Sequence, residues 1–134
     1  MSPEPEATGS RKQAGAAQPA CCPFYHEAVE LIGRRWTGAI VAVLLDNGPL
    51  RFSEIAQAVP ELSDRLLSER MKELEARGVV ARHVEPGPPV RVTYSLTAMG
   101  RELQPALQEL KSWARQWLAQ EEQQRGRRRP VRTL

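Results

Sequence analysis

The chain has 134 residues, of which 41% are hydrophobic and 26% are charged, a composition typical of a single globular domain. It contains no run of about 18 apolar residues, so no membrane span is expected, and its first residues lack the order of a signal peptide, which favours the cytoplasm. Five arginines lie in the last ten residues, and subtracting them from the net charge of +3 leaves −2 for the rest. Affinity for a polyanion must therefore come from the local arrangement of charges.

The two ends of the chain differ in composition from the middle. Residues 1–20 contain no leucine, isoleucine, valine or aromatic side chain, so they cannot bury enough apolar surface to fold. We predict a disordered N-terminal arm there and a basic, disordered tail over residues 121–134. The folded domain is expected to span residues 21–120.

Two helices are predicted before residue 50. Apolar residues recur at helical spacing from Phe24 to Ile32, and Gly33 ends this first helix. The second helix is predicted from Trp36 to Leu45, before the helix-breaking segment 46–49. Its inner face is expected to carry Trp36, Ile40, Val43 and Leu44.

Residues 50–96 contain the most specific pattern, two short helices followed at once by a hairpin. The first helix is predicted to begin at an N-cap Ser53 and to end before Pro60. The second runs from its N-cap Ser63 to residue 77, with a buried stripe of Leu67, Met71 and Leu74. The hairpin pairs residues 79–84 with 90–96 around the tip 85–89. This order is typical of a winged helix-turn-helix, in which the second helix enters a DNA major groove and the hairpin contacts the neighbouring backbone or minor groove.

The last long helix is predicted to begin at an N-cap Thr97 and to carry a wide apolar arc. The arc is wider than one small domain needs to cover, so we expect it to bury against a second subunit, near Phe24 and Leu31. The fold class is therefore α+β, mainly α: a winged helix-turn-helix with flanking dimerisation helices. The arc consists of Leu103, Ala106, Leu107, Leu110, Trp113, Ala114, Trp117 and Leu118.

The outward face of the 63–77 helix supplies the main candidate DNA contacts. Arg65 is the best candidate for a base contact, because a guanidinium can bind guanine O6 and N7, whereas Ser68 and Lys72 suit phosphates. The alternative is a solvated amphipathic face, against which the following hairpin argues. The candidates on this helix are Ser63, Asp64, Arg65, Ser68 and Lys72.

Further candidates lie before and after this helix. Arg51 either meets a phosphate at a helix N-terminus or pairs with a glutamate and braces the hairpin. In the hairpin, Arg91 is the preferred DNA contact, and Arg82, His83 and Gly87 complete the wing set. His83 alone is better interpreted as an exposed strand residue.

The two cysteines, Cys21 and Cys22, are adjacent, so a disulfide between them would be strained and could not staple a loop. Either both are reduced bystanders, or one reacts with another chain or a small molecule. Cys22 is the candidate redox or electrophile sensor, because the start of a helix favours a thiolate. His26 and Cys22 make only a weak metal pair, so no metal or other cofactor is expected.

Together these segments resemble the HxlR-type branch of bacterial winged helix-turn-helix transcription regulators, relatives of the MarR type. The resemblance implies a homodimer with interlocked first and last helices that binds a near-palindromic operator, and several such regulators use an N-terminal cysteine as a sensor. It adds Arg35 to the DNA-contact candidates, in the position of a family lysine. The chain departs from the family at Arg34, in place of glycine, and at Thr93, in place of glutamate. The matching segments are 22–23, 31–36, 51–55, 62–75, 78–80, 89–97 and Gly100.

We therefore predict a transcription regulator that binds double-stranded DNA as a homodimer in the cytoplasm, at the nucleoid, under the control of cysteine chemistry or a small-molecule effector. No glycine-rich phosphate loop, paired metal-ligand spacing or nucleophile elbow supports an enzyme. The alternative is a winged-helix module that binds a protein without binding specific DNA.

Overall fold

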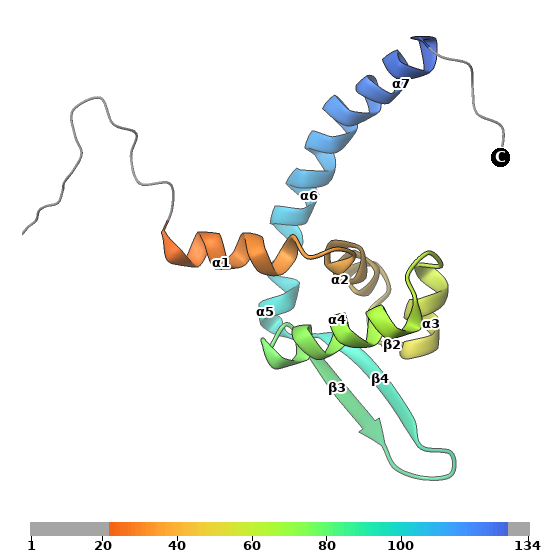
Figure 1. Ribbon diagram of the computed structural model, residues 1–134. Helices are drawn as coiled ribbons and strands as arrows, with labels where there is room; N and C mark the ends of the chain where they lie inside the picture. The colour runs from red at the N-terminus through yellow and green to blue at the C-terminus, as the bar shows by residue number, and fades with distance from the viewer. Residues whose placement is uncertain (1–21, 129–134) are drawn as a thin grey trace, which may run out of the picture. The chain divides into compact units, whose positions relative to one another are not determined.

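The computed structural model describes residues 22–128 (Figure 1). The chain divides into two units, Met1–Gly33 and Arg34–Leu134. The predicted N-terminal arm lies outside the described residues. Within residues 22–128, no helix is long and apolar enough to cross a membrane.

The described part of the first unit is the helix α1 (Pro23–Ile32). Cys22 is its N-cap, and the Cys22 sulfur accepts a hydrogen bond from the Tyr25 backbone N–H at 3.2 Å. The helix ends as predicted at Gly33, whose N–H donates to the Val29 carbonyl at 2.7 Å. Phe24, predicted to lie on the apolar side, is 79% exposed.

The second unit begins with the helix α2 (Thr37–Asn47), whose predicted inner face is only partly right. Trp36 precedes the helix with a left-handed backbone, φ 75°. The helical stripe therefore starts one residue later than predicted. As a result Val41 is buried in place of Val43. The buried residues of α2 are Thr37, Ile40, Val41 and Leu44.

The helix pair consists of α3 (Phe52–Ala58) and α4 (Asp64–Ala76). The predicted Ser53 cap is wrong: Arg51 is the N-cap, because the Glu54 carboxylate accepts its backbone N–H at 2.8 Å. The predicted Ser63 cap is confirmed, since its hydroxyl accepts the Leu66 N–H at 3.2 Å. The stripe is buried as predicted, at Leu67, Met71 and Leu74.

The predicted hairpin is confirmed as β3 (Val80–Glu85) and β4 (Arg91–Leu96). A short strand, β2 (Leu50–Arg51), pairs with the other edge of β4 and makes a three-stranded antiparallel sheet of order β2-β4-β3. The hairpin tip projects beyond the helices of this unit (Figure 1). The core between the helix pair, α2 and the sheet includes Ile40, Val41, Ile55, Leu67, Leu74, Val79 and Val80.

After the sheet, α5 (Ala98–Arg101), α6 (Gln104–Trp113), a π-helix η1 (Ala114–Leu118) and α7 (Ala119–Arg128) follow one another. Thr97 caps the short α5, not the long helix as predicted, through the Gly100 N–H at 3.2 Å. Pro105 explains the break, because it has no N–H to continue the hydrogen bonds of α5.

The prediction of a disordered tail is wrong for residues 121–128, which belong to α7. This segment is rich in glutamate, glutamine and arginine, which are good helix formers. Arg125 pairs with Glu121 at 3.6 Å and also with Glu122, one helical turn away. Residues 129–134 lie outside the described residues.

Candidate nucleic-acid interface

The outward face of α4 carries polar and charged side chains along its length. Asp64, Ser68 and Lys72 are spaced by four residues and share one face. Arg65 lies beside them with its side chain 90% exposed, and its Nε is 3.6 Å from a Glu69 carboxylate oxygen. Such a surface ion pair contributes little to stability. Arg65 can therefore exchange Glu69 for a partner offered by a ligand.

Ser63 and Ser68 are less free than the charged residues of this face. The Ser63 oxygen is the N-cap acceptor of α4, so only its hydroxyl proton remains for a phosphate oxygen. Ser68 is half-buried. The longest exposed donors of the helix are therefore Arg65 and Lys72.

The sheet register divides the predicted wing residues between two faces. His83 lies opposite Thr93, and Arg51 lies opposite Thr93 on the other edge. Directly paired residues share a face and alternate residues return to it. Arg51, His83 and Arg91 therefore line one face, while Arg82 lies on the other, with the core residue Val80.

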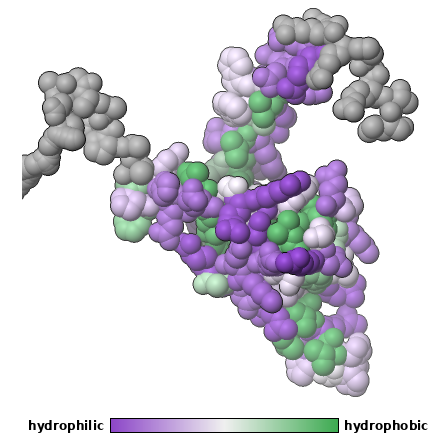
Figure 2. All heavy atoms as spheres, in the orientation of Figure 1, coloured by the Kyte–Doolittle hydropathy of each residue, from purple (hydrophilic) through white to green (hydrophobic). Residues whose placement is uncertain are grey.

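The hairpin beyond the core is exposed and partly apolar. Val84 and Val90 are at least half exposed, and Figure 2 shows hydrophobic residues at the lower end of the molecule, where the hairpin lies. Gly87 at the tip has φ 122°, a conformation that favours glycine. His83 Nε2 is 2.9 Å from the Ser95 hydroxyl oxygen. His83 is thus an exposed strand residue held to β4.

Arg51 takes the second of the two roles that its sequence left open, since it pairs with a glutamate and braces the hairpin. Its guanidinium Nη2 is 3.5 Å from a Glu54 carboxylate oxygen, and its backbone belongs to β2, which braces the hairpin strand β4. The Arg51 backbone N–H, helped by the guanidinium, lowers the pKa of the Glu54 carboxyl. Because the pKa of Glu54 is lowered in the folded state, the hydrogen bond from the Arg51 N–H to its carboxylate stabilises α3 at neutral pH. This stabilisation is lost as the pH falls through the folded-state pKa of Glu54.

A buried polar cluster on α4 was missed by the sequence reasoning. Arg70 is only 8% exposed. Its Nε donates to the Arg35 carbonyl at 2.9 Å, and its Nη1 donates to the Glu73 carboxylate at 3.2 Å. Arg34 reaches the same Glu73 oxygen at 3.2 Å. Arg35 itself is exposed, with its guanidinium carbon 5.3 Å from the Trp36 ring centre.

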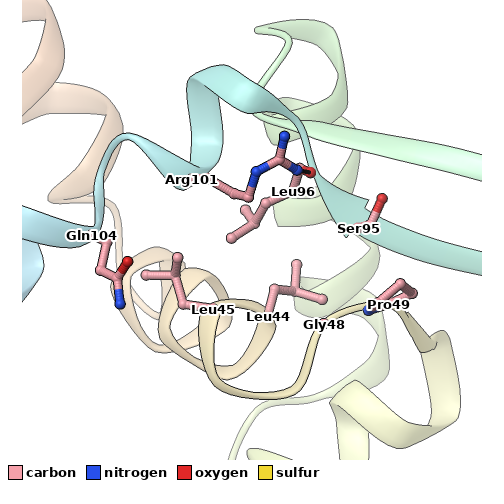
Figure 3. Close-up of a pocket in the computed structure, with 8 residues that line it drawn as sticks. All are labelled: Leu44, Leu45, Gly48, Pro49, Ser95, Leu96, Arg101 and Gln104. Atoms are coloured by element: carbon pink, nitrogen blue, oxygen red, sulfur yellow. Dashed lines mark hydrogen bonds between the residues drawn. The ribbon is translucent and has the colours of Figure 1, made fainter.

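A pocket of about 400 Å³ lies where α2, β4, α5 and α6 meet (Figure 3). Leu44 and Leu45 face Leu96 across it. Arg101 stands at its edge, and its Nη1 donates to the Leu96 carbonyl at 2.8 Å. The other residues that line the pocket are Gly48, Pro49, Ser95 and Gln104.

Two helices with a polar outer face on the second, followed by a braced hairpin, define a winged helix-turn-helix protein. The HxlR-like helix-turn-helix family matches residues 31–122. The chain belongs to this family of transcriptional regulators.

Two relatives from Bacillus subtilis illustrate the similarity. The HTH-type transcriptional regulator YvaP is 52% identical over 101 residues, which cover 75% of this chain and 93% of YvaP. The HTH-type transcriptional regulator YodB is 47% identical over 96 residues, which cover 72% of this chain and 85% of YodB. Both relatives are named as HTH-type transcriptional regulators.

YodB has been solved in more than one state. Its reduced form aligns with this chain at a TM-score of 0.67 and 46% identity, covering 72% of this chain and 94% of YodB. Its quinone-bound form aligns at a TM-score of 0.64 and 43% identity, covering 72% of this chain and 100% of YodB.

Proposed function

We propose that this protein binds a near-palindromic operator in double-stranded DNA as a homodimer and regulates transcription there. The exposed polar face of α4, followed directly by the projecting hairpin, is the observation that carries the proposal. In a dimer, two such helices would enter successive major grooves about 34 Å apart. Binding to the chromosome would bring the protein to the nucleoid.

The side chains divide into those that read bases and those that bind phosphates. Arg65, near the N-terminus of α4, presents a planar fork suited to guanine, and Asp64 beside it can accept from a cytosine amino group. Lys72, two turns further along, is a flexible point charge suited to a phosphate. Arg51 and Arg91, on one face of the sheet, offer further positive charge to the backbone that flanks the groove.

A second copy of the chain is the partner that best fits the exposed side of the C-terminal helices. Leu110, Trp113 and Trp117 recur at three- and four-residue spacing and are all more than half exposed. Figure 2 shows hydrophobic residues along α6. Exposed apolar patches of this kind mark interaction surfaces. A symmetric dimer would also match the symmetry of a palindromic operator.

Alanine substitutions at Arg65 and Lys72 test the assignment of α4. Arg65→Ala is expected to cost about 1–3 kcal/mol of binding free energy and to relax base preference at one position. Lys72→Ala should weaken binding to all sequences alike and lower the salt slope of log K by about one unit. The measurement is fluorescence anisotropy on a DNA fragment that the wild-type protein selects from a randomised pool.

Gln108→Ala is the matched control, because Gln108 is an exposed, uncharged residue on α6, outside α4 and the hairpin. Wild-type affinity in both alanine variants would show that the groove-facing side is wrongly assigned. If the wild-type protein selects no fragment at low salt, DNA binding itself fails. The winged helix would then be a protein-binding module.

We further propose that Cys22 controls operator affinity by reaction with oxidants or electrophiles. The Cys22 thiol is free and exposed, and its sulfur accepts the Tyr25 backbone N–H at the start of α1. The relative YodB binds a quinone in one of its solved forms. Diamide or a quinone is expected to weaken operator binding at least tenfold in the wild-type protein.

Cys21→Ser and Cys22→Ser, made separately, distinguish the two adjacent thiols, since Cys21 lies outside the described residues. Operator binding by Cys22→Ser should no longer respond to diamide, whereas Cys21→Ser should respond like the wild type. An unchanged response in Cys22→Ser contradicts a sensing role for Cys22. The effector would then be a non-reactive small molecule, for which the pocket beside Arg101 has a suitable size and an apolar lining.

A further inference from the structure

Arg70 is a charged residue in a core position of α4. It lies on the same side of the helix as Leu67, Met71 and Leu74, and it is 8% exposed. A guanidinium out of contact with water is costly unless its N–H groups find acceptors. The partners that Arg70 finds therefore indicate why it is there.

Those partners join α4 to the segment where the second unit begins. Arg70 Nε donates to the Arg35 carbonyl at 2.9 Å, 35 residues earlier in the chain. The Glu73 carboxylate accepts from Arg70 at 3.2 Å and pairs with Arg34 at 3.2 Å. We name Arg70, Glu73, Arg34 and the Arg35 carbonyl the Arg70 cluster. Both of its links to the 34–36 segment start from α4.

The 34–36 segment has a conformation that needs outside support. Trp36 has φ 75°, which is unfavourable for a bulky residue. The turn is closed by the Thr37 N–H, which donates to the Arg34 carbonyl at 3.0 Å. Arg70 holds the Arg35 carbonyl, which lies inside this turn. The direction of α4 and the shape of the turn therefore depend on each other.

We propose that Arg70 is the positioning residue that transmits the state of the N-terminal helix to α4. The inference rests on the proposed function, in which α4 binds DNA and Cys22 is modified. The helix that begins after Cys22 ends at Ile32, two residues before Arg34. A displacement of this helix therefore enters the second unit at the turn that Arg70 holds, and the Arg70 cluster carries it into α4.

Arginine suits this role better than lysine. Its planar fork reaches the Arg35 carbonyl and the Glu73 carboxylate at the same time, whereas a lysine ammonium acts as a single flexible point charge. Methionine has a similar length and keeps the apolar contact of the stem. Arg70→Met and Arg70→Lys therefore separate the two hydrogen bonds from the packing.

The test compares operator affinity before and after diamide treatment. In the wild-type protein we expect at least a tenfold loss of affinity. In Arg70→Met the reduced protein should bind up to tenfold more weakly than wild type, and diamide should change this value by less than twofold. A merely structural role would weaken both forms equally and leave the ratio unchanged. Arg70→Lys should not restore the ratio.

Amide hydrogen exchange gives a second readout that does not depend on DNA or on Cys22. Exchange at Thr37, whose N–H closes the turn, is expected to rise at least tenfold in Arg70→Met and to stay unchanged in the control Gln108→Ala. Glu73→Gln, which keeps the Arg70–Arg35 hydrogen bond, replaces Arg70→Met if that variant does not fold, and should give a smaller effect in the same direction.

Two outcomes would overturn the inference: a wild-type diamide ratio in Arg70→Met, or unchanged exchange at Thr37. A wild-type protein that does not respond to diamide would instead contradict the proposed control by Cys22. In that case the exchange at Thr37 still decides whether Arg70 holds the turn.

Discussion

Replacement of Gly100 by alanine is expected to lower the free energy of unfolding by about 3 kcal/mol or more, at the upper end of what overpacking costs. A Cβ at this position would lie 2.3 Å from the Val79 carbonyl oxygen and 2.9 Å from Leu96 Cδ2. The Val79 carbonyl cannot easily move away, because it accepts the Thr97 N–H at 3.0 Å. Urea denaturation, followed by circular dichroism, measures the loss as a lower transition midpoint.

Gly38→Ala is the matched control for this substitution. Gly38 lies inside α2, and an added Cβ there would meet no atom within 4 Å. Alanine is favoured over glycine in a helix by about 1 kcal/mol, so this variant should be as stable as the wild type or more stable. Equal midpoints for Gly100→Ala and the wild type would mean that α5 can shift away from the sheet. The close contact would then not fix its position.

Most of the fold could be predicted because its signals are local. Ser63 caps α4, and Gly87 at the hairpin tip adopts a conformation that favours glycine. Strand β2 could not be predicted in the same way. It has two residues, too few for an alternating pattern, and it exists because Leu50 and Arg51 pair with Tyr94 and Thr93, more than forty residues later.

The exposure of the candidate DNA contacts on α4 could be predicted, because helical periodicity alone determines it. The buried stripe of α4 leaves Arg65 and Lys72 outside. The period of two in a strand would also have separated Arg82 from His83, whereas the face of Arg91 depends on the register between the two strands. These wing residues were grouped because they are near the tip in sequence.

The burial of Arg70 could have been predicted from the sequence, but its hydrogen-bond partner could not. Its spacing of three residues from Leu67 places it on the apolar side of α4, which is an available signal for an unusual buried charge. Its acceptor is the carbonyl of Arg35. Side-chain patterns do not predict a backbone acceptor 35 residues away, so the partner required the three-dimensional structure.

The double substitution Trp113→Ser and Trp117→Ser is expected to make the protein monomeric and to lower its operator affinity by about 100-fold or more. The two indole side chains are 52% and 54% exposed on the C-terminal helices, so their removal should not disturb the core of the second unit. A monomer offers a single α4 to the DNA. It therefore loses the gain of about 10²–10⁴ that comes from binding two linked half-sites.

Sedimentation velocity at micromolar concentration measures the association, and fluorescence anisotropy measures the affinity. Met99→Gln is the control, since Met99 is an equally exposed apolar residue on α5, outside the exposed side of the C-terminal helices that carries Leu110, Trp113 and Trp117. It should remain dimeric and bind like the wild type. A double tryptophan variant that stays dimeric would show that the exposed apolar side of the C-terminal helices is not the subunit interface. If the variant is monomeric but keeps full affinity, α4 and the hairpin of one subunit suffice for binding, and the operator need not be palindromic.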